Sequence, residues 1–213
     1  FDGKLCRHKD TGRKIAAMMP MHTFGHPAQI YELLDICKSW GLTLVEDAAE
    51  SLGSQYKNKH TGTFGKFGAF SFNGNKIITT GGGGMLLARD EEDGKLAKHV
   101  TSTARLPHSF EFFHDQIGFN YRMPNLNAAL GCAQIERISD YIKKKRELAK
   151  SYQKYFQNSD SLSFIEEPPG TRSNYWLNAV VCQDEGHRDY LISTLNEYWS
   201  QANMEVDEPA ANV

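Results

Sequence analysis

Two apolar runs separated by a helical repeat constrain the fold of this chain more than any other feature. Residues 15–21 are a short apolar run that ends in a loop, and residues 42–45 are a second run that leads directly into Glu46 and Asp47. Apolar positions between the runs recur at helical spacing, at Ile30, Leu33, Leu34 and Cys37. Gly41 stands where such a helix would end. This strand–helix–strand order predicts a parallel α/β sheet.

The rest of the chain continues the alternation of strands and helices. We predict strands over residues 67–72, 84–88 and 175–181, and helices over residues 90–99, 125–156 and 187–199, the long stretch being two helices or one bent helix. A proline pair at 168–169 marks a break before the last strand. We therefore expect an α/β protein with a partial large domain over residues 1–157 and a partial small α+β domain over residues 158–213.

Charge and hydropathy argue against several kinds of partner. The 213 residues carry a formal net charge of -2, which provides no bulk attraction to nucleic acid or to an anionic membrane. No apolar run is long enough to span a bilayer. A basic run at residues 143–146 lies in a helical stretch with glutamates nearby, which predicts a solvated helix face. We expect neither a nucleic-acid partner nor a membrane partner.

The cysteines and the chain ends suggest a cytoplasmic fragment. The four cysteines form no CxxC pair, and none has a histidine at metal-ligand spacing. We therefore expect ordinary thiols in a reducing cytoplasm and no metal site. The chain begins at Phe1 rather than at a methionine, and its last residues, up to Val213, read like an interruption. It is expected to be a fragment of a longer protein.

Asp47 is the first candidate for chemistry, because it directly follows a predicted strand. Ligands of open α/β sheets bind beyond the carboxyl ends of the strands, so an acid at this place faces the ligand. Aspartate is equally common as a helix N-cap or in a turn. Taken alone, this position leaves both interpretations open.

Lys76 is the second candidate. It follows an apolar strand and precedes Thr80 and the glycine run at 81–84. Lysine is usually a solvated surface residue. Small flanking residues, however, let the backbone approach a ligand, and the Ser71 and Thr80 hydroxyls and glycine N–H groups suit a phosphate. A lysine desolvated in such a place can act as an amine nucleophile.

The pair is more informative than either residue alone. Pyridoxal-phosphate chemistry needs a lysine that forms a Schiff base and a carboxylate that keeps the pyridine nitrogen protonated. Asp47 and Lys76 follow neighbouring predicted strands, 29 positions apart (76 − 47), which is compatible with one site.

Four sequence blocks resemble a known family. They are VEDAAESLG at 45–53, TGTFG at 61–65, FSFNGNKIITTGGGGM at 70–85 and IGFNYRM at 117–123. In this order they resemble the DegT/DnrJ/EryC1/StrS sugar aminotransferases, from about residue 15 to residue 196. The resemblance implies an aspartate-aminotransferase-like (fold type I) large domain and pyridoxal 5'-phosphate as cofactor. The SFNGNK form is most similar to members that aminate UDP-linked 4-keto-6-deoxy sugars on the way to bacillosamine- or legionaminic-acid-type products.

The resemblance also implies roles for five residues. Lys76 would bind the cofactor covalently and later carry a proton, and Asp47 would pair with the pyridinium nitrogen. Ala49 would pack against the ring, and Ser71 would bind the phosphate. Asn120 would reach the phosphate in a neighbouring subunit, so that a homodimer shares its active sites.

Glu50 departs from the family pattern, in which a glutamine often binds the ring hydroxyl. A carboxylate facing a phenolate is unfavourable unless one of them holds a proton. Other side chains keep two interpretations. Asn120 and Arg122 could instead satisfy turn backbone, His22 and His26 could line the site or cap the loop, and His108 and His114 could contact substrate or be plain surface. The glycine run could be merely a flexible turn, although close backbone packing there would require glycine.

The implied reaction moves an amino group, by resemblance from L-glutamate, to a nucleotide-linked 4-keto-6-deoxy sugar in the synthesis of surface-polysaccharide precursors. A sugar dehydratase on the same scaffold is an alternative, but its members have a histidine where this chain has Lys76. A truncated, inactive chain that serves as a cofactor-binding or dimerisation module is the second alternative. A sheet without its first strands would expose unpaired edges and apolar surface.

Overall fold

The computed structural model describes residues 5–206, and only the backbone of residues 200–206. Both chain ends on which the fragment expectation rests, residues 1–3 and 209–213, lie outside this part. The chain forms two compact units, of which the first contains the residues up to Lys150 together with Glu167–Leu177. The second contains Ser151–Glu166 and the residues from Asn178 onward. This division differs from the predicted domain boundary between residues 157 and 158, because Glu167–Leu177 belongs to the first unit.

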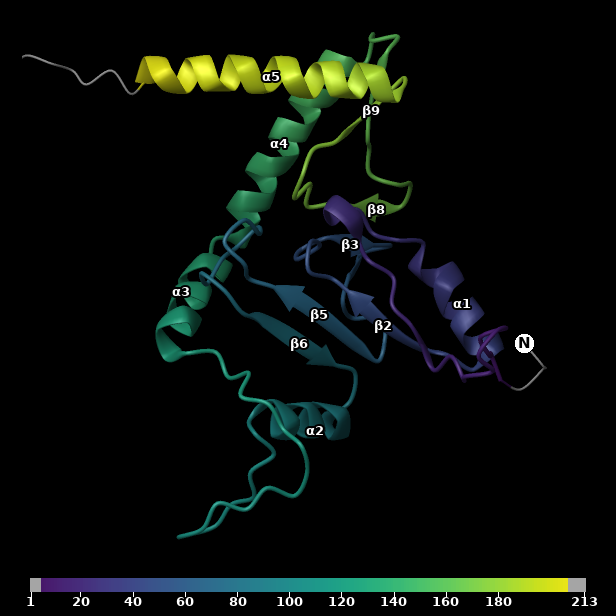
Figure 1. Cartoon of the computed structure of the whole chain (residues 1–213), viewed down its shortest axis with the longest axis vertical. Helices are drawn as coiled ribbons and strands as arrows, with labels where there is room; N and C mark the ends of the chain where they lie inside the picture. The colour runs from purple at the N-terminus through teal and green to yellow at the C-terminus, as the bar shows by residue number, and fades with distance from the viewer. Residues whose placement is uncertain (1–4, 207–213) are drawn as a thin grey trace, which may run out of the picture. The chain divides into compact units, whose positions relative to one another are not determined.

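The central sheet of the first unit has the order β1-β2-β5-β6 (Figure 1). Its strands are β1 (Ala17–Met18), β2 (Thr43–Asp47), β5 (Phe67–Ser71) and β6 (Gly84–Ala88). β1 and β5 run parallel to β2, and β6 runs antiparallel to β5. The parallel α/β expectation is confirmed, and the carboxyl ends of β2 and β5 meet at one edge, where Asp47 is in register with Ala69.

Helix α1 (Ile30–Trp40) connects β1 to β2 and contacts β2. It ends as predicted at Gly41, whose φ of 62° places it in the left-handed region that favours glycine. The buried core of this part is apolar and consists of Ile30, Cys37, Leu44, Tyr56 and Phe64. The apolar face of the predicted helix therefore covers the sheet, as its spacing required.

A small antiparallel sheet was not predicted. It has the order β4-β3-β8, from β3 (Gln55–Tyr56), β4 (Lys59–His60) and β8 (Thr171–Arg172). Lys57 and Asn58, with φ of 47° and 63°, form the tight turn between β3 and β4. The pairing of β3 with β8 joins segments more than a hundred residues apart and brings residues 173–176 into the first unit.

The helices that follow the sheet are α2 (Glu91–Thr101), α3 (Asn125–Ile135) and α4 (Ile138–Phe156). The long helical stretch is therefore two helices. Asp90 caps α2 by accepting a hydrogen bond from the Asp93 N–H. Residues 102–121, called the arm below, project away from the sheet beside α2 (Figure 1). Two isolated bridges pair the sides of the arm, Ser102 with Asn120 and Arg105 with His114.

The second unit pairs β7 (Leu162–Phe164) with β9 (Val180–Cys182) and adds α5 (Glu185–Val206). The strand predicted over residues 175–181 is wrong over residues 175–179, because β9 begins only at Val180. Tyr175 has a φ of 49°, which is incompatible with a strand, and the side chains of Ser173 and Asn174 hydrogen-bond the backbone of residues 175 and 176.

The described residues contain no helix that is both long and apolar enough to cross a membrane. They do expose apolar surface on the last strand of the sheet. Met85 and Leu86 of β6 are 52% and 46% exposed, and within the described chain β6 pairs only with β5. The expected unpaired edge is therefore present.

Candidate active site

Lys76 lies in the loop after β5, and its amine is held between two partners. The Nζ atom is 3.8 Å from Glu50 Oε1 and 3.9 Å from the centre of the Trp176 ring. The side chain is only 13% exposed. The usual interpretation of a lysine as a solvated surface residue is therefore wrong at this position.

The loop that carries Lys76 is fixed by hydrogen bonds from both sides. The Lys76 N–H donates to Asn73 O (3.1 Å), and the indole Nε1–H of Trp176 donates to Asn75 O (2.7 Å). Beyond the lysine, the Thr79 N–H donates to Gln134 Oε1 on α3 (3.0 Å). The backbone on both sides of Lys76 is thus ordered by these contacts.

Asp47 makes the turn contact that one interpretation of its position predicted, and its role toward a ligand stays a prediction. Its Oδ1 accepts the Ala49 N–H at 3.1 Å, which is a turn contact. Its Oδ2 accepts no hydrogen bond from the described residues, and the side chain is half-buried at the carboxyl end of β2. One oxygen therefore orders the turn, and the other is available to a ligand.

Ser71 shares a sheet face with Asp47. Asp47 is in register with Ala69, and Ser71 lies two residues further along the same strand. Ser71 Oγ accepts the Asn73 N–H at 3.3 Å, so its own hydrogen remains available as a donor. Glycine is required at position 84, because a Cβ there would overlap the Phe70 carbonyl. The end of the glycine run is therefore a packed strand rather than a flexible turn.

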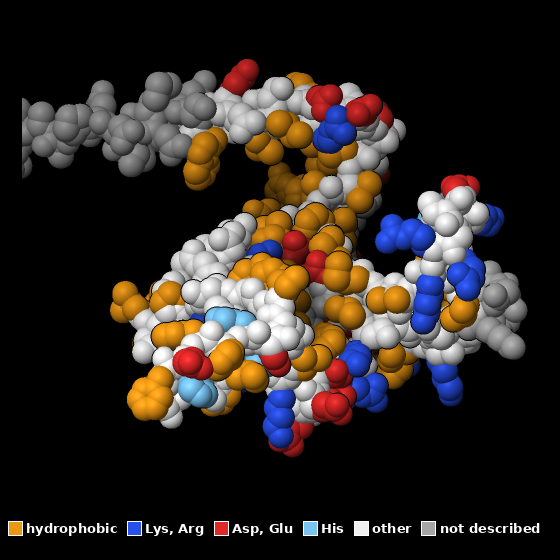
Figure 2. Space-filling view, turned by 60° about the horizontal axis from the view of Figure 1, so that its bottom comes forward, with side chains coloured by type: hydrophobic (Ala, Val, Ile, Leu, Met, Phe, Trp, Pro, Cys, Tyr) orange, Lys and Arg blue, Asp and Glu red, His pale blue; other side chains and the backbone are white. Residues whose placement is uncertain are grey.

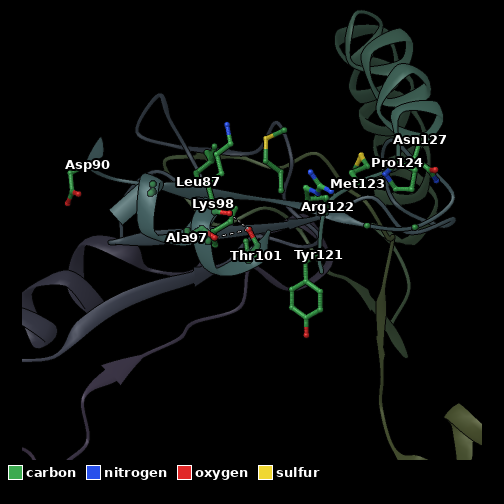
Figure 3. A pocket seen from close by; sticks show the side chains of 18 residues that line it. Leu87, Asp90, Ala97, Lys98, Thr101, Tyr121, Arg122, Met123, Pro124 and Asn127 are labelled. Atoms are coloured by element: carbon green, nitrogen blue, oxygen red, sulfur yellow. Dashed lines mark hydrogen bonds between the residues drawn. The ribbon is translucent and has the colours of Figure 1, made fainter. Parts of the chain in front are cut away.

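A cavity of about 930 Å³ is lined by residues of β6, of α2 and of the segment 121–127, together with Ala69 of β5. Figure 3 shows Lys98 and Thr101 of α2 near one part of it and Met123, Pro124 and Asn127 near another. Arg122 also lines it, so its side chain faces a cavity and is not confined to a turn. The predicted site residues themselves do not line this cavity.

Glu50 connects the lysine to the loop after β1. Its Oε2 accepts the Phe24 N–H at 2.7 Å, and its Oε1 faces Lys76. Phe24 has a φ of 59°, an uncommon conformation for a residue other than glycine. A glutamate in place of glutamine at position 50 therefore has a physical reason, because the ammonium of Lys76 offers its carboxylate a compensating charge.

Glu46 was not predicted, although it precedes Asp47. Strand alternation turns it to the opposite face, where it is fully buried. Its carboxylate accepts four hydrogen bonds, from the Gly62, Phe64 and Gly65 N–H groups (2.6–2.7 Å) and from His22 Nε2 (3.1 Å). Burial raises the pKa of Glu46, but these hydrogen bonds together outweigh burial and hold the pKa below its usual value.

Of the two interpretations of His22, lining the site or capping the loop, the structure shows the loop cap. It is fully buried, and its Nδ1 accepts the Ala28 N–H at 3.0 Å. The proton must therefore sit on Nε2, which donates to Glu46. His26 packs its ring edge-on against Tyr175, with 5.1 Å between the ring centres. Neither of its ring nitrogens has a hydrogen-bond partner in the described chain.

Residues 173–176 form a buried segment that the sequence did not reveal. Asn174 is fully buried, and its Nδ2 donates to Glu50 O (2.8 Å) and Leu52 O (3.0 Å). Its Oδ1 accepts the Trp176 N–H at 2.8 Å. The segment therefore ties the turn that follows Asp47 to the ring that faces Lys76.

The basic run at residues 143–146 is only partly a solvated face. Lys145 Nζ donates to Trp176 O at 3.0 Å. Arg146 pairs with both oxygens of Glu167 at 2.7 and 2.9 Å, and it also donates to Ser173 O. Half of the run therefore anchors the segment that carries Trp176, and the solvated-face prediction is wrong for Lys145 and Arg146.

The arm carries the remaining predicted residues. Asn120 is exposed and pairs with Ser102, away from the Lys76 loop within one chain. His108 Nδ1 accepts the Phe110 and Glu111 N–H groups, and His114 Nδ1 lies 2.7 Å from Thr103 O. The two histidines thus order the arm itself. Within the described residues, no three His, Cys, Asp or Glu side chains are grouped to hold a metal.

The fold places the chain in the class of aminotransferases. The solved aminotransferase TlmJ from Streptoalloteichus hindustanus matches with a TM-score of 0.83 and 29% identity, over 89% of this chain and 52% of that structure. The sequence model of the DegT/DnrJ/EryC1/StrS aminotransferase family matches residues 8–208. The chain therefore belongs to this family, whose cofactor is pyridoxal phosphate.

Curated relatives agree with this membership. EpsN of Bacillus subtilis (strain 168) is 40% identical over 184 residues, which is 86% of this chain and 47% of EpsN. A GDP-perosamine synthase of Escherichia coli O157:H7 is 39% identical over 183 residues, 85% of this chain and 49% of that protein. The chain spans about half the length of the curated relatives that it matches.

Proposed function

We propose that this chain is the cofactor-binding part of an aminotransferase that transfers an amino group, from a donor such as L-glutamate, to a nucleotide-linked 4-keto-6-deoxy sugar. The observation that carries the proposal is the Lys76 amine, which is 13% exposed beside Glu50 and Trp176. It follows β5, whose neighbour β2 ends in Asp47 at the same edge of the sheet. A cytoplasmic role in making surface-polysaccharide precursors stays a prediction.

The residues present fit pyridoxal phosphate. When bound, this group supplies an electron sink for the carbon that gains or loses the amine. Asp47 Oδ2 would hold the ring nitrogen in its protonated form, and Ala49 would lie against the ring face. The Ser71 hydroxyl, whose hydrogen is not used within the chain, would donate to the phosphate. Lys76 would hold the group covalently and move the proton at the reacting carbon.

Glu50 fits this arrangement because of its neighbours. With the Lys76 ammonium at 3.8 Å and the Phe24 N–H at 2.7 Å, its charge is balanced before any ligand arrives. In the family pattern this position serves the ring hydroxyl. We propose that Glu50 serves it too, sharing a proton with that hydroxyl.

A titration of the purified protein with pyridoxal phosphate tests the proposed function. We expect a visible absorbance band that L-glutamate bleaches, because the donor moves its amino group onto the cofactor and frees Lys76. A band that glutamate leaves unchanged would instead support the second interpretation, a cofactor-binding or dimerisation module. That alternative has weight because the chain spans about half the length of its relatives.

The names of two relatives bear on the choice of sugar and nucleotide. One relative is named GDP-perosamine synthase, and another, from Helicobacter pylori (strain ATCC 700392 / 26695) and 29% identical, is named UDP-4-amino-4,6-dideoxy-N-acetyl-beta-L-altrosamine transaminase. We propose a UDP-linked 4-keto-6-deoxy sugar, as the SFNGNK form suggests. Mass spectrometry of products from UDP-, GDP- and dTDP-linked keto-sugars would decide. Loss of a water in place of a gained amino group would indicate a dehydratase.

We propose that the arm packs on a second copy of the chain. Its apolar side chains are unusually exposed, with Phe110 at 90%, Ile117 at 84% and Phe112 at 71%. Figure 2 shows exposed hydrophobic side chains, among polar and charged ones, on the surface that comes forward. Packing on a second copy would bury them and carry Asn120 to the partner's phosphate site.

Disrupting the arm should therefore abolish the dimer. We expect the wild-type protein to sediment as a dimer and the Phe110→Asp/Phe112→Asp variant as a monomer, because charges would replace apolar contacts at the interface. Glu111→Gln, on the same loop, is the matched control and should stay dimeric. A wild-type protein that sediments as a monomer at micromolar concentration would contradict the proposal.

A further inference from the structure

Trp176 makes more hydrogen bonds than a residue that only fills the core needs. Its side chain is buried, with 6% exposure, and every polar group of the residue has a partner. The backbone N–H donates to Asn174 Oδ1 (2.8 Å), and the carbonyl accepts from Lys145 Nζ (3.0 Å). The indole N–H donates to Asn75 O (2.7 Å). The residue is therefore held through both backbone groups and through its ring.

The fixed ring faces the Lys76 amine. Nζ lies 3.9 Å from the ring centre, well within the distance at which an aromatic face attracts a cation. Glu50 Oε1 attracts the same ammonium at 3.8 Å. Both attractions act on a side chain that is 13% exposed, where water screens them less than at the surface.

The same residue fixes the loop and the side chain of the lysine. Through Asn75 the indole N–H holds the backbone next to Lys76, and through its face it holds the amine. A lysine side chain has a long flexible stem, so an unrestrained amine would spread over many rotamers. The contacts with Trp176 and Glu50 select one resting place.

We propose that Trp176 is a positioning residue which, together with Glu50, holds the free amine of Lys76 in a resting place whenever this amine is not bonded to the cofactor. The inference rests on the proposed function, since transamination in two half-reactions releases the lysine in between. The resting place keeps the amine between Glu50 and Trp176 until it is needed again.

Amine labelling of the cofactor-free protein tests this role. The purified protein is stripped of cofactor, treated briefly with acetic anhydride at fixed pH, and digested, and mass spectrometry compares acetylation of Lys76 with that of exposed Lys144. For Trp176→Leu we expect Lys76 to react roughly two- to thirtyfold faster, the range that a lost cation–π contact implies. Trp176→Phe, which keeps an aromatic face, should react at an intermediate rate. Glu50→Gln should also speed the reaction.

Tyr175→Leu is the matched control. It removes the neighbouring buried ring, which is 7% exposed and contacts His26 and Arg146. It should lower the melting temperature about as much as Trp176→Leu and leave the labelling of Lys76 unchanged. Equal acceleration in both variants, or none in Trp176→Leu, would overturn the proposal.

Failure here is distinguishable from failure of the proposed function. The labelling involves no cofactor, so an unchanged rate in Trp176→Leu would reject the resting place while a cofactor band that glutamate bleaches would still stand. Conversely, accelerated labelling without any cofactor band would support the contact and reject transamination.

Discussion

Replacing Lys76 with alanine is expected to abolish the visible absorbance of the protein with pyridoxal phosphate and to lower the amination rate by at least roughly 10³-fold. The variant loses the covalent attachment and the proton carrier at once. The reason is geometric as well as chemical, because Lys76 has the one amine of the described chain held between Glu50 and Trp176. Absorption spectra and product formation from a keto-sugar nucleotide measure both effects.

Lys144→Ala provides the control, since that lysine is exposed on α4 and contacts none of the proposed site residues. Its band and its rate should equal those of the wild type. A Lys76→Ala protein that keeps the visible band would show that another lysine bonds the cofactor, and the role proposed for Lys76 would be wrong.

Replacing Glu46 with alanine is expected to have the largest effect on stability, about 3–5 kcal/mol. The carboxylate is fully buried, and its removal would leave the Gly62, Phe64 and Gly65 N–H groups and His22 without their acceptor. Urea unfolding measures the loss. Glu32→Ala, an exposed position on α1, is the control and should change stability by less than about 1 kcal/mol.

The Glu46 contribution should also depend on pH with a definite sign. Hydrogen bonds hold the folded-state pKa below the ordinary value of 4.5, so the stabilisation is fully present above 4.5. It is lost as the pH falls through the folded-state pKa, when the buried carboxylate must be protonated. Stability of Glu46→Gln should therefore fall less steeply than that of the wild type below pH 4.5. Parallel curves would contradict the assigned charge.

Local patterns predicted most of the first unit. The helical spacing up to Cys37 and the glycine at position 41 define α1, and the apolar runs around it define the parallel strands. What escaped prediction depends on distant partners. The pairing of Gln55 with Arg172 leaves no mark in either short segment, and Tyr175 leaves the extended conformation because of side-chain contacts that only the fold brings together.

The candidate site divides in the same way. Lys76 and Asp47 stood out as candidates because Asp47 closes β2 and Lys76 lies in the loop that follows β5. Glu46 had a signal that was overlooked, since alternation along β2 must bury one of two adjacent acids. Trp176 had none, because its contact with the lysine spans a hundred residues. The role proposed for Asn120 would require a second copy of the chain.

A crystal structure of the protein with pyridoxal phosphate bound measures the central claim most directly. Density should run without a break from the amine at position 76 into the cofactor, with the far ring nitrogen within hydrogen-bonding distance of the carboxylate at position 47. A ring attached elsewhere, or one whose nitrogen faces solvent while that carboxylate points away, would contradict the account.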